Sequence, residues 1–113
     1  MRFISLVIAL TVFGPAVACD TNDIEIQQSS WRVDGEYTRV VGEFKNGCTE
    51  PTGAQLQLVF RRKSGEIVHV KDFWPASTNN VKAGALHAFG TMDRLAGLSF
   101  DQVDVKVIAV KRW

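Results

Sequence analysis

The chain has 113 residues, with 13 Lys and Arg against 12 Asp and Glu, and so a formal charge of +1. Once the predicted leader described below is set aside, the length fits one domain and not two. A charge this close to zero creates no long-range field that would attract a polyanion. We therefore expect no nucleic-acid partner.

Residues 1–18, MRFISLVIALTVFGPAVA, have the three-part pattern of a secretory signal peptide. Arg2 supplies the positive start, an apolar run extends from Phe3 to Phe13, and Gly14-Pro15 precedes small residues. A membrane-spanning helix needs about 20 apolar residues, and this run is shorter. We expect cleavage after Ala18 and an extracytoplasmic protein, either periplasmic or secreted.

Cys19 would then be the first residue of the mature chain. The preceding AVA also resembles the bacterial lipobox, in which a lipidated cysteine follows a small residue, although Ala16 stands where Leu is usual. The alternative is therefore a lipoprotein that is anchored to the membrane through Cys19. Only in that case do we expect a membrane partner.

From Ile24 onward apolar residues recur at every second position, which is the period of a strand with one buried face. Asp34-Gly35 is expected to form the centre of a type I′ hairpin turn. In the final strand, Val103, Val105, Val107 and Ala109 are assigned to one face. The expected strands are 24–33, 37–46, 55–62, 67–74, 85–92 and 102–113. Residues 19–113 thus predict one all-β domain, an antiparallel immunoglobulin-like β-sandwich of about six to seven strands, with an open barrel as the alternative.

Two stretches, VVGEFKNGCTEPTGAQLQLVFRRKSGEIV (40–68) and VKAGALHAF (81–89), resemble the FxLYD-type modules. These modules are immunoglobulin-like domains of bacterial and archaeal extracytoplasmic proteins. The likeness covers roughly residues 37–110, with Val59-Phe60-Arg61 in place of the name-giving Leu-Tyr-Asp. The resemblance implies an interaction or structural module outside the cytoplasm.

Cys19 and Cys48 are the two cysteines of the chain, and an even pair in an oxidising compartment favours a disulfide. With Asp34-Gly35 at the turn, Cys48 lies opposite Thr21, which is two residues from Cys19. A modest bend brings the two cysteines within disulfide range. We predict a Cys19–Cys48 bridge, which excludes a lipid on the same sulfur.

Trp31, Trp74 and Trp113 lie at or near strand ends, where a ring either packs on the rim of the core or faces a partner. Arg61 and Arg62 lie in a basic cluster at a predicted hairpin tip, with solvation or anion binding as the two interpretations. These five residues are the candidate partner-binding set.

The sequence offers little for catalysis, because it contains no nucleophile motif and only two histidines, His69 and His87. Both are expected at exposed or half-exposed strand positions. We predict no catalytic, metal or cofactor site. The expected function is a non-enzymatic, monomeric module that binds a protein or cell-envelope component. The alternative is a small periplasmic inhibitor of a hydrolase that acts through loop 48–54 or 75–80, and an enzyme ranks third.

Overall fold

The structure, a computed structural model, describes residues 19–113, and the predicted signal peptide at 1–18 lies outside the described residues. A single turn of 3-10 helix, η1 (Thr21–Asp23), precedes six strands. They are β1 (Ile24–Asp34), β2 (Tyr37–Asn46), β3 (Gly53–Arg61), β4 (Ile67–Phe73), β5 (Leu86–Arg94) and β6 (Gln102–Lys111). In the described part of the chain, no helix has the length and apolar character needed to cross a membrane.

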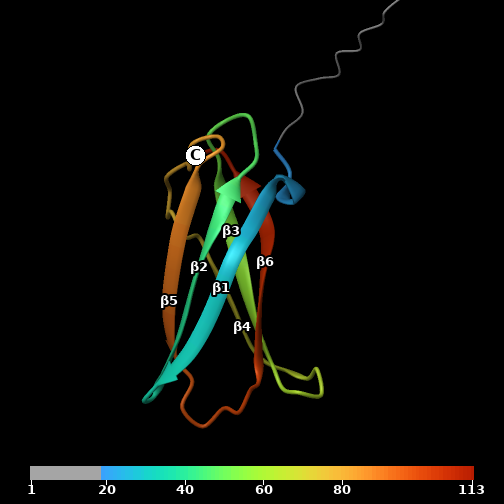
Figure 1. Ribbon diagram of the computed structural model, residues 1–113, viewed down its shortest axis with the longest axis vertical. Coiled ribbons are helices and arrows are strands. Elements are labelled where there is room, and N and C mark those ends of the chain that lie inside the picture. Colours follow the sequence, from blue (N-terminus) through green and yellow to red (C-terminus); the bar gives the residue numbers. More distant parts are fainter. Residues whose placement is uncertain (1–18) are drawn as a thin grey trace, which may run out of the picture.

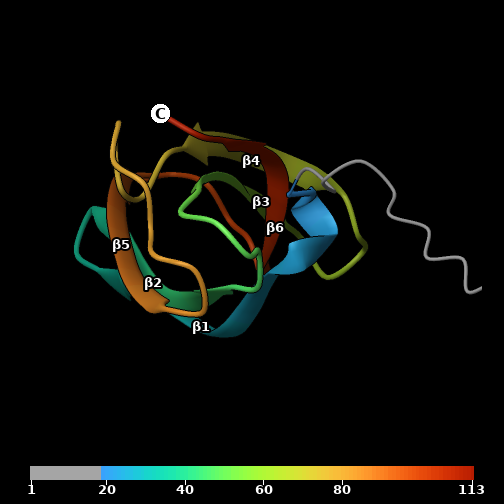
Figure 2. The same ribbon diagram turned by 90° about the horizontal axis from the view of Figure 1, so that it is seen from above.

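The strands form two antiparallel sheets, with the orders β1-β2-β5 and β4-β3-β6. Figure 2 shows the sheets as two facing layers. These orders correspond to strands A-B-E and C′-C-F of an immunoglobulin sandwich. The predicted antiparallel sandwich is therefore confirmed, and the open barrel is not formed.

The core lies between the sheets, where alternate residues of the two central strands point inward. Phe44 of β2 and Leu56, Leu58 and Phe60 of β3 are at most 1% exposed. Burial of each such side chain stabilises the fold by roughly 1.5–3 kcal/mol. Gly42 leaves room for the Phe89 ring, because a Cβ at Gly42 would lie 2.5 Å from Phe89 Cζ.

The first hairpin turns one residue later than the sequence predicts. Asp34 pairs with Tyr37, so Gly35 and Glu36 are the two central residues of the turn. The prediction that Asp34 and Gly35 form its centre is therefore wrong. Gly35 has a φ of 65°, and Glu36 is not among the residues with positive φ. Positive φ at the first central residue alone is typical of a type II′ turn, which places glycine there.

Three β-bulges, in β1, β4 and β6, interrupt the strict alternation that the sequence predicts. In β1 the bulge falls between Ile26 and Gln28, and Trp31 on its far side faces the same core as Ile26. In β6 the ladder to β3 slips beside Ile108, so that Val110 packs on the core. The expected place of Ala109 on the face of Val107 is therefore wrong, because an extra residue reverses the alternation.

Polar side chains close one side of the sandwich, where the edge strands β4 and β5 face each other. Lys71 of β4 forms an ion pair with Asp93 of β5 and donates a hydrogen bond to Thr91 Oγ1. His69 Nε2 lies 3.5 Å from the second Asp93 oxygen. We call these four residues the polar seam. Inward-pointing charges on edge strands discourage the addition of a further strand.

Candidate functional site

The segment before β1, the loop after β2 and the C-terminus lie at one end of the sandwich (Figure 1), and the disulfide joins the first two of them. Cys19, immediately before η1, is bonded to Cys48 in the loop after β2, with a Cα–Cα distance of 5.4 Å. The predicted bridge is therefore present. We call this region the disulfide end, made of residues 19–23, 47–52, 74–85 and 111–113.

The register that led to this bridge differs from the predicted one. Ile24 pairs with Asn46, which sets Cys48 opposite residue 22 by extrapolation and not opposite Thr21. The later turn shifts the pairing by two residues and the bulge in β1 shifts it back by one, so the predicted partner of Cys48 is off by a single residue. The short turn of η1 then brings Cys19 back to Cys48.

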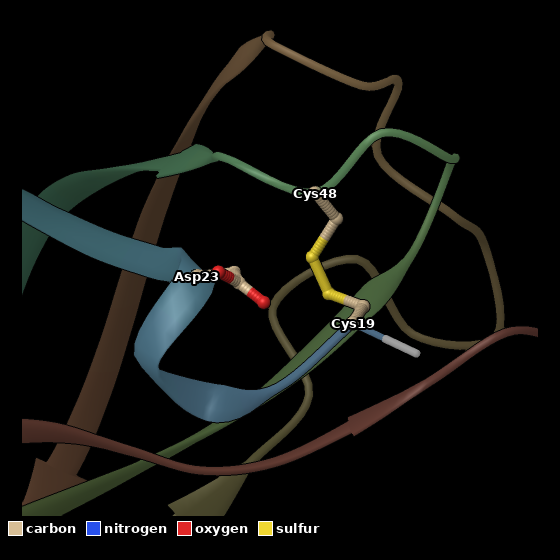
Figure 3. Close-up of side chains that lie close together, drawn as sticks. All are labelled: Cys19, Asp23 and Cys48. Carbon is tan, nitrogen blue, oxygen red and sulfur yellow. A yellow bond between two sulfur atoms is a disulfide. The ribbon is translucent and has the colours of Figure 1, made fainter. Parts of the chain in front are cut away.

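Asp23 lies beside the disulfide (Figure 3), and one of its oxygens is within 4.8 Å of both sulfurs. In the bonded form neither sulfur is a thiolate, so this cluster offers a metal only one carboxylate. That carboxylate accepts a hydrogen bond of 2.9 Å from the main-chain N–H of Asp20, which completes the capping box of η1. The disulfide and the Asp23 carboxylate thus fix residues 19–23.

Asn46 organises the loops behind the disulfide. Its fully buried side-chain amide donates to the carbonyl oxygens of Val81 and Glu50 and accepts a hydrogen bond from the main-chain N–H of Cys48. Its main chain bonds to Gly84 and Ala85. One side chain therefore joins the loop after β2 to the segment before β5.

Trp113 and Trp74 meet at this end, with ring centroids 5.4 Å apart and planes at 75°. The main chain of Trp113 exchanges two hydrogen bonds with the side-chain amide of Asn80. Its indole packs against Gly53, where a Cβ would lie 2.6 Å from Trp113 Nε1, and Lys111 Nζ lies 4.2 Å from its ring centroid. Trp113 is nevertheless 43% exposed. The aromatic pair is thus held firmly and remains accessible to a partner.

Two hollows lie at the disulfide end. One, of about 470 Å³, is lined by the disulfide and by Glu50 and Arg112, which form an ion pair of 2.8 Å. The other, of about 540 Å³, lies between the loop at 75–82 and the start of β5. The disulfide end therefore combines aromatic, charged and recessed surface.

The other predicted partner-binding residues lie away from this end. Trp31 in β1 packs against Phe100, with centroids 5.0 Å apart, and this contact belongs to the rim of the core. Arg61 forms an ion pair of 2.8 Å with Asp104, and Arg62 one of 3.1 Å with Glu66. The structure brings Trp74 and Trp113 together but not these three.

Two neighbouring side chains stabilise the charged form of Asp104. Hydrogen bonds from the side chains of Gln102 and then Arg61 stabilise its charged form and lower its pKa. Arg61 also donates to the carbonyl oxygen of Gly65. The guanidinium of Arg61 is therefore engaged in structural contacts.

Both histidines are half-buried, in agreement with the sequence prediction. His69 belongs to the polar seam, and the ring of His87 lies 5.5 Å from that of Phe44. Among residues 19–113, no Ser, Thr or Cys side chain hydrogen-bonds to either histidine. Neither histidine is thus paired with a nucleophile in this part of the chain.

The roles of Asn46, Asn80 and the polar seam are not evident from the sequence. The signal for Asn46 was slight, since an asparagine before glycine at the end of a strand is equally typical of a solvated turn. The polar seam could be predicted only with knowledge of which two edge strands face each other.

Comparison of the chain with family models, curated proteins and solved structures finds no match.

Proposed function

We propose that this protein is a non-enzymatic, extracytoplasmic β-sandwich module that binds a protein or cell-envelope partner through its disulfide end. The observation that carries the proposal is the exposed Trp113, held against Trp74 on a rigid base. Tryptophan is enriched among residues that dominate binding energies at interfaces. An aromatic ring that is already fixed loses little conformational entropy when a partner docks.

Three separate ties support the rigidity of this surface. The disulfide holds residue 19 to the loop after β2, Asn46 holds that loop to the segment before β5, and Asn80 holds the end of the chain. These ties converge from segments that are distant in sequence. A surface fixed in this way suits recognition of a partner more than a large rearrangement.

The compartment follows from the disulfide, which is typical of an oxidising environment outside the cytoplasm. We place the protein in the periplasm or the secreted fraction, as a monomer, and we retain the resemblance to the FxLYD-type modules. The strand order A-B-E and C′-C-F is compatible with that resemblance. A lipid on Cys19 is the rival, and it requires the sulfur that is bonded to Cys48 in the structure.

Affinity capture from the native envelope tests the proposal. Wild-type protein, Trp113→Ala and Arg62→Ala serve as baits, and mass spectrometry compares what each one retains. Arg62 lies at the opposite end of the sandwich and is the matched control. We expect one set of partners to be lost with Trp113→Ala and kept with Arg62→Ala. Equal retention by all three baits would contradict a role for the disulfide end.

A second function, inhibition of a hydrolase, is favoured by the fixed loop at 47–52. Asn46 and Thr52 side chains both donate to the carbonyl oxygen of Glu50, and the Thr52 main chain pairs with that of Val81. A rigid, exposed loop is what a substrate-like inhibitor requires. If a lone hydrolase is captured, its activity should fall on addition of the wild-type protein and not of a variant with Glu50 and Pro51 replaced by glycine.

A further inference from the structure

A different surface, the outer face of the β1-β2-β5 sheet, carries two arginines in direct opposition. Arg32 of β1 pairs with Arg39 of β2 in the ladder, and both side chains are exposed. Opposed residues on one face of an antiparallel pair have Cβ atoms roughly 4.5–5.5 Å apart, and like charges at this distance destabilise the pair. The fold therefore carries an electrostatic cost here that a bound anion would remove.

These two arginines also differ from the rest of the described chain. The other arginines among residues 19–113 each form an ion pair, namely Arg61 with Asp104, Arg62 with Glu66, Arg94 with Glu36 and Arg112 with Glu50. Within the same residues, Arg32 and Arg39 form neither an ion pair nor a side-chain hydrogen bond. Their donors are free for a ligand.

The sheet beside the arginines is recessed. A hollow of about 300 Å³ is lined by the two arginines together with Ser30, Trp31 and Val41. In the ladder, Ser30 and Gly90 both lie opposite Val41, so small residues flank it on each side. A second hollow of about 420 Å³ shares Ser30 and Val41. A ligand held by the arginines therefore has space to extend along the sheet.

From this geometry we propose that Arg32 and Arg39 bind the phosphoryl group of a phosphate monoester, whose remaining atoms lie over Ser30 and Val41. A phosphate monoester carries about −1.5 to −2 charges at pH 7, which matches two guanidinium groups better than a single carboxylate does. Planar guanidinium forks also bind phosphate oxygens in pairs. The site is distinct from the disulfide end and adds a ligand to the proposed module.

Titration of the full mature protein with glucose 6-phosphate, followed by amide NMR shifts, tests the site. We expect millimolar binding that shifts Ser30, Arg32, Arg39 and Val41, with no shift from glucose and a weaker one from acetate. Lowering the pH below about 6, where the phosphate group takes up its second proton, should weaken binding. Arginine keeps its charge over this range, so the change reports the ligand.

Variants separate this site from a diffuse positive surface. Arg32→Gln and Arg39→Gln should each weaken binding by about tenfold or more, the effect of losing a charge-assisted hydrogen bond. Arg94→Gln, on the same face but paired with Glu36, should bind as the wild type does. Thermal melts of all variants confirm folding. Absence of shifts at these residues, or an equal loss with Arg94→Gln, would overturn the proposal.

Discussion

At the scale of single residues, buried Asn46 shows how one side chain fixes several loops. Replacing Asn46 with alanine leaves the buried N–H of Cys48 without a partner and removes one of the two hydrogen bonds to the Val81 carbonyl oxygen, which keeps the bond from the Thr52 N–H. We expect a loss of about 3 kcal/mol in the free energy of unfolding, because the unpaired buried N–H costs roughly 1–3 kcal/mol and each further lost hydrogen bond costs about 1 kcal/mol. Urea denaturation measures it. The exposed Asn79→Ala serves as the control and should change stability by less than about 0.5 kcal/mol.

Gly42 and Gly90 provide a matched pair of glycines on neighbouring strands. In Gly42→Ala the new Cβ would lie 2.5 Å from both Gln28 O and Phe89 Cζ, whereas at Gly90 the nearest atom is 3.6 Å away. We expect Gly42→Ala to lower stability by about 2–3 kcal/mol through overpacking. Gly90→Ala should stay within about 0.5 kcal/mol of the wild type. Similar melting temperatures for the two variants would contradict this packing.

The sequence predicted the bridge of Cys19 and Cys48 but did not reveal the roles of Asn46 and Asn80. The reason is physical. A disulfide needs two cysteines, and the small number of cysteines limits the possible pairings. An asparagine amide can bond to any main-chain group, and its partners here are set by loops that meet only after folding. Trp74 and Trp113 were candidates, but their contact could not be read from their spacing.

At the scale of elements, the disulfide ties the segment before β1 to the loop after β2. Replacing both Cys19 and Cys48 with serine should cost about 3 kcal/mol of stability, since the closed loop spans 29 residues of separation. Reductant should destabilise the wild type by a similar amount and leave the double variant unchanged. Denaturation with and without reductant makes this comparison. An equal effect of reductant on both proteins would contradict a stabilising bridge.

The polar seam between β4 and β5 gives a prediction about association. Lys71→Met leaves the carboxylate of Asp93, whose side chain is only 17% exposed, without its cationic partner. The variant should lose about 2 kcal/mol or more of the free energy of unfolding. Adding Asp93→Leu should recover most of that stability, because an apolar pair often replaces an ion pair without loss.

The double variant should, however, self-associate at high concentration, because the inward charges that block strand addition are gone. Light scattering of the wild type and the double variant measures this. A monomeric double variant would contradict the prediction that the polar seam prevents strand addition.

The strands themselves were predictable, since alternating apolar residues and turn residues mark all six of them. The bulges at Gln27 and Ile108 were not, because an extra residue in a strand leaves no distinct composition. The position of the first turn was missed for a related reason. Asp34-Gly35 and Gly35-Glu36 both contain the one glycine that the turn needs, and the choice depends on the turn type.

At the scale of the whole molecule, the two ends of the sandwich differ in what they present. The disulfide end presents a fixed aromatic pair and two hollows. At the opposite end, Arg61 and Arg62 are neutralised by Asp104 and Glu66. This asymmetry is the basis for assigning partner binding to one end.

Intact mass of the protein from its native envelope decides how the molecule is held there. We expect the mass of residues 19–113 less two hydrogen atoms, which corresponds to cleavage after Ala18 and oxidation of Cys19 and Cys48 to a disulfide. An added diacylglycerol on Cys19 would instead make the protein a membrane-anchored lipoprotein and would contradict the bridge as its native form.

Site-specific photo-crosslinking in the native envelope tests the central claim most directly. A crosslinking amino acid replaces exposed Thr78 in the loop at 75–80 of the disulfide end or, as the control, exposed Lys63 at the opposite end. We expect a discrete crosslinked product from position 78, lost when Trp113→Ala is added, and none from position 63. A product from position 63 alone, or one at position 78 that Trp113→Ala leaves unchanged, would contradict binding through the disulfide end.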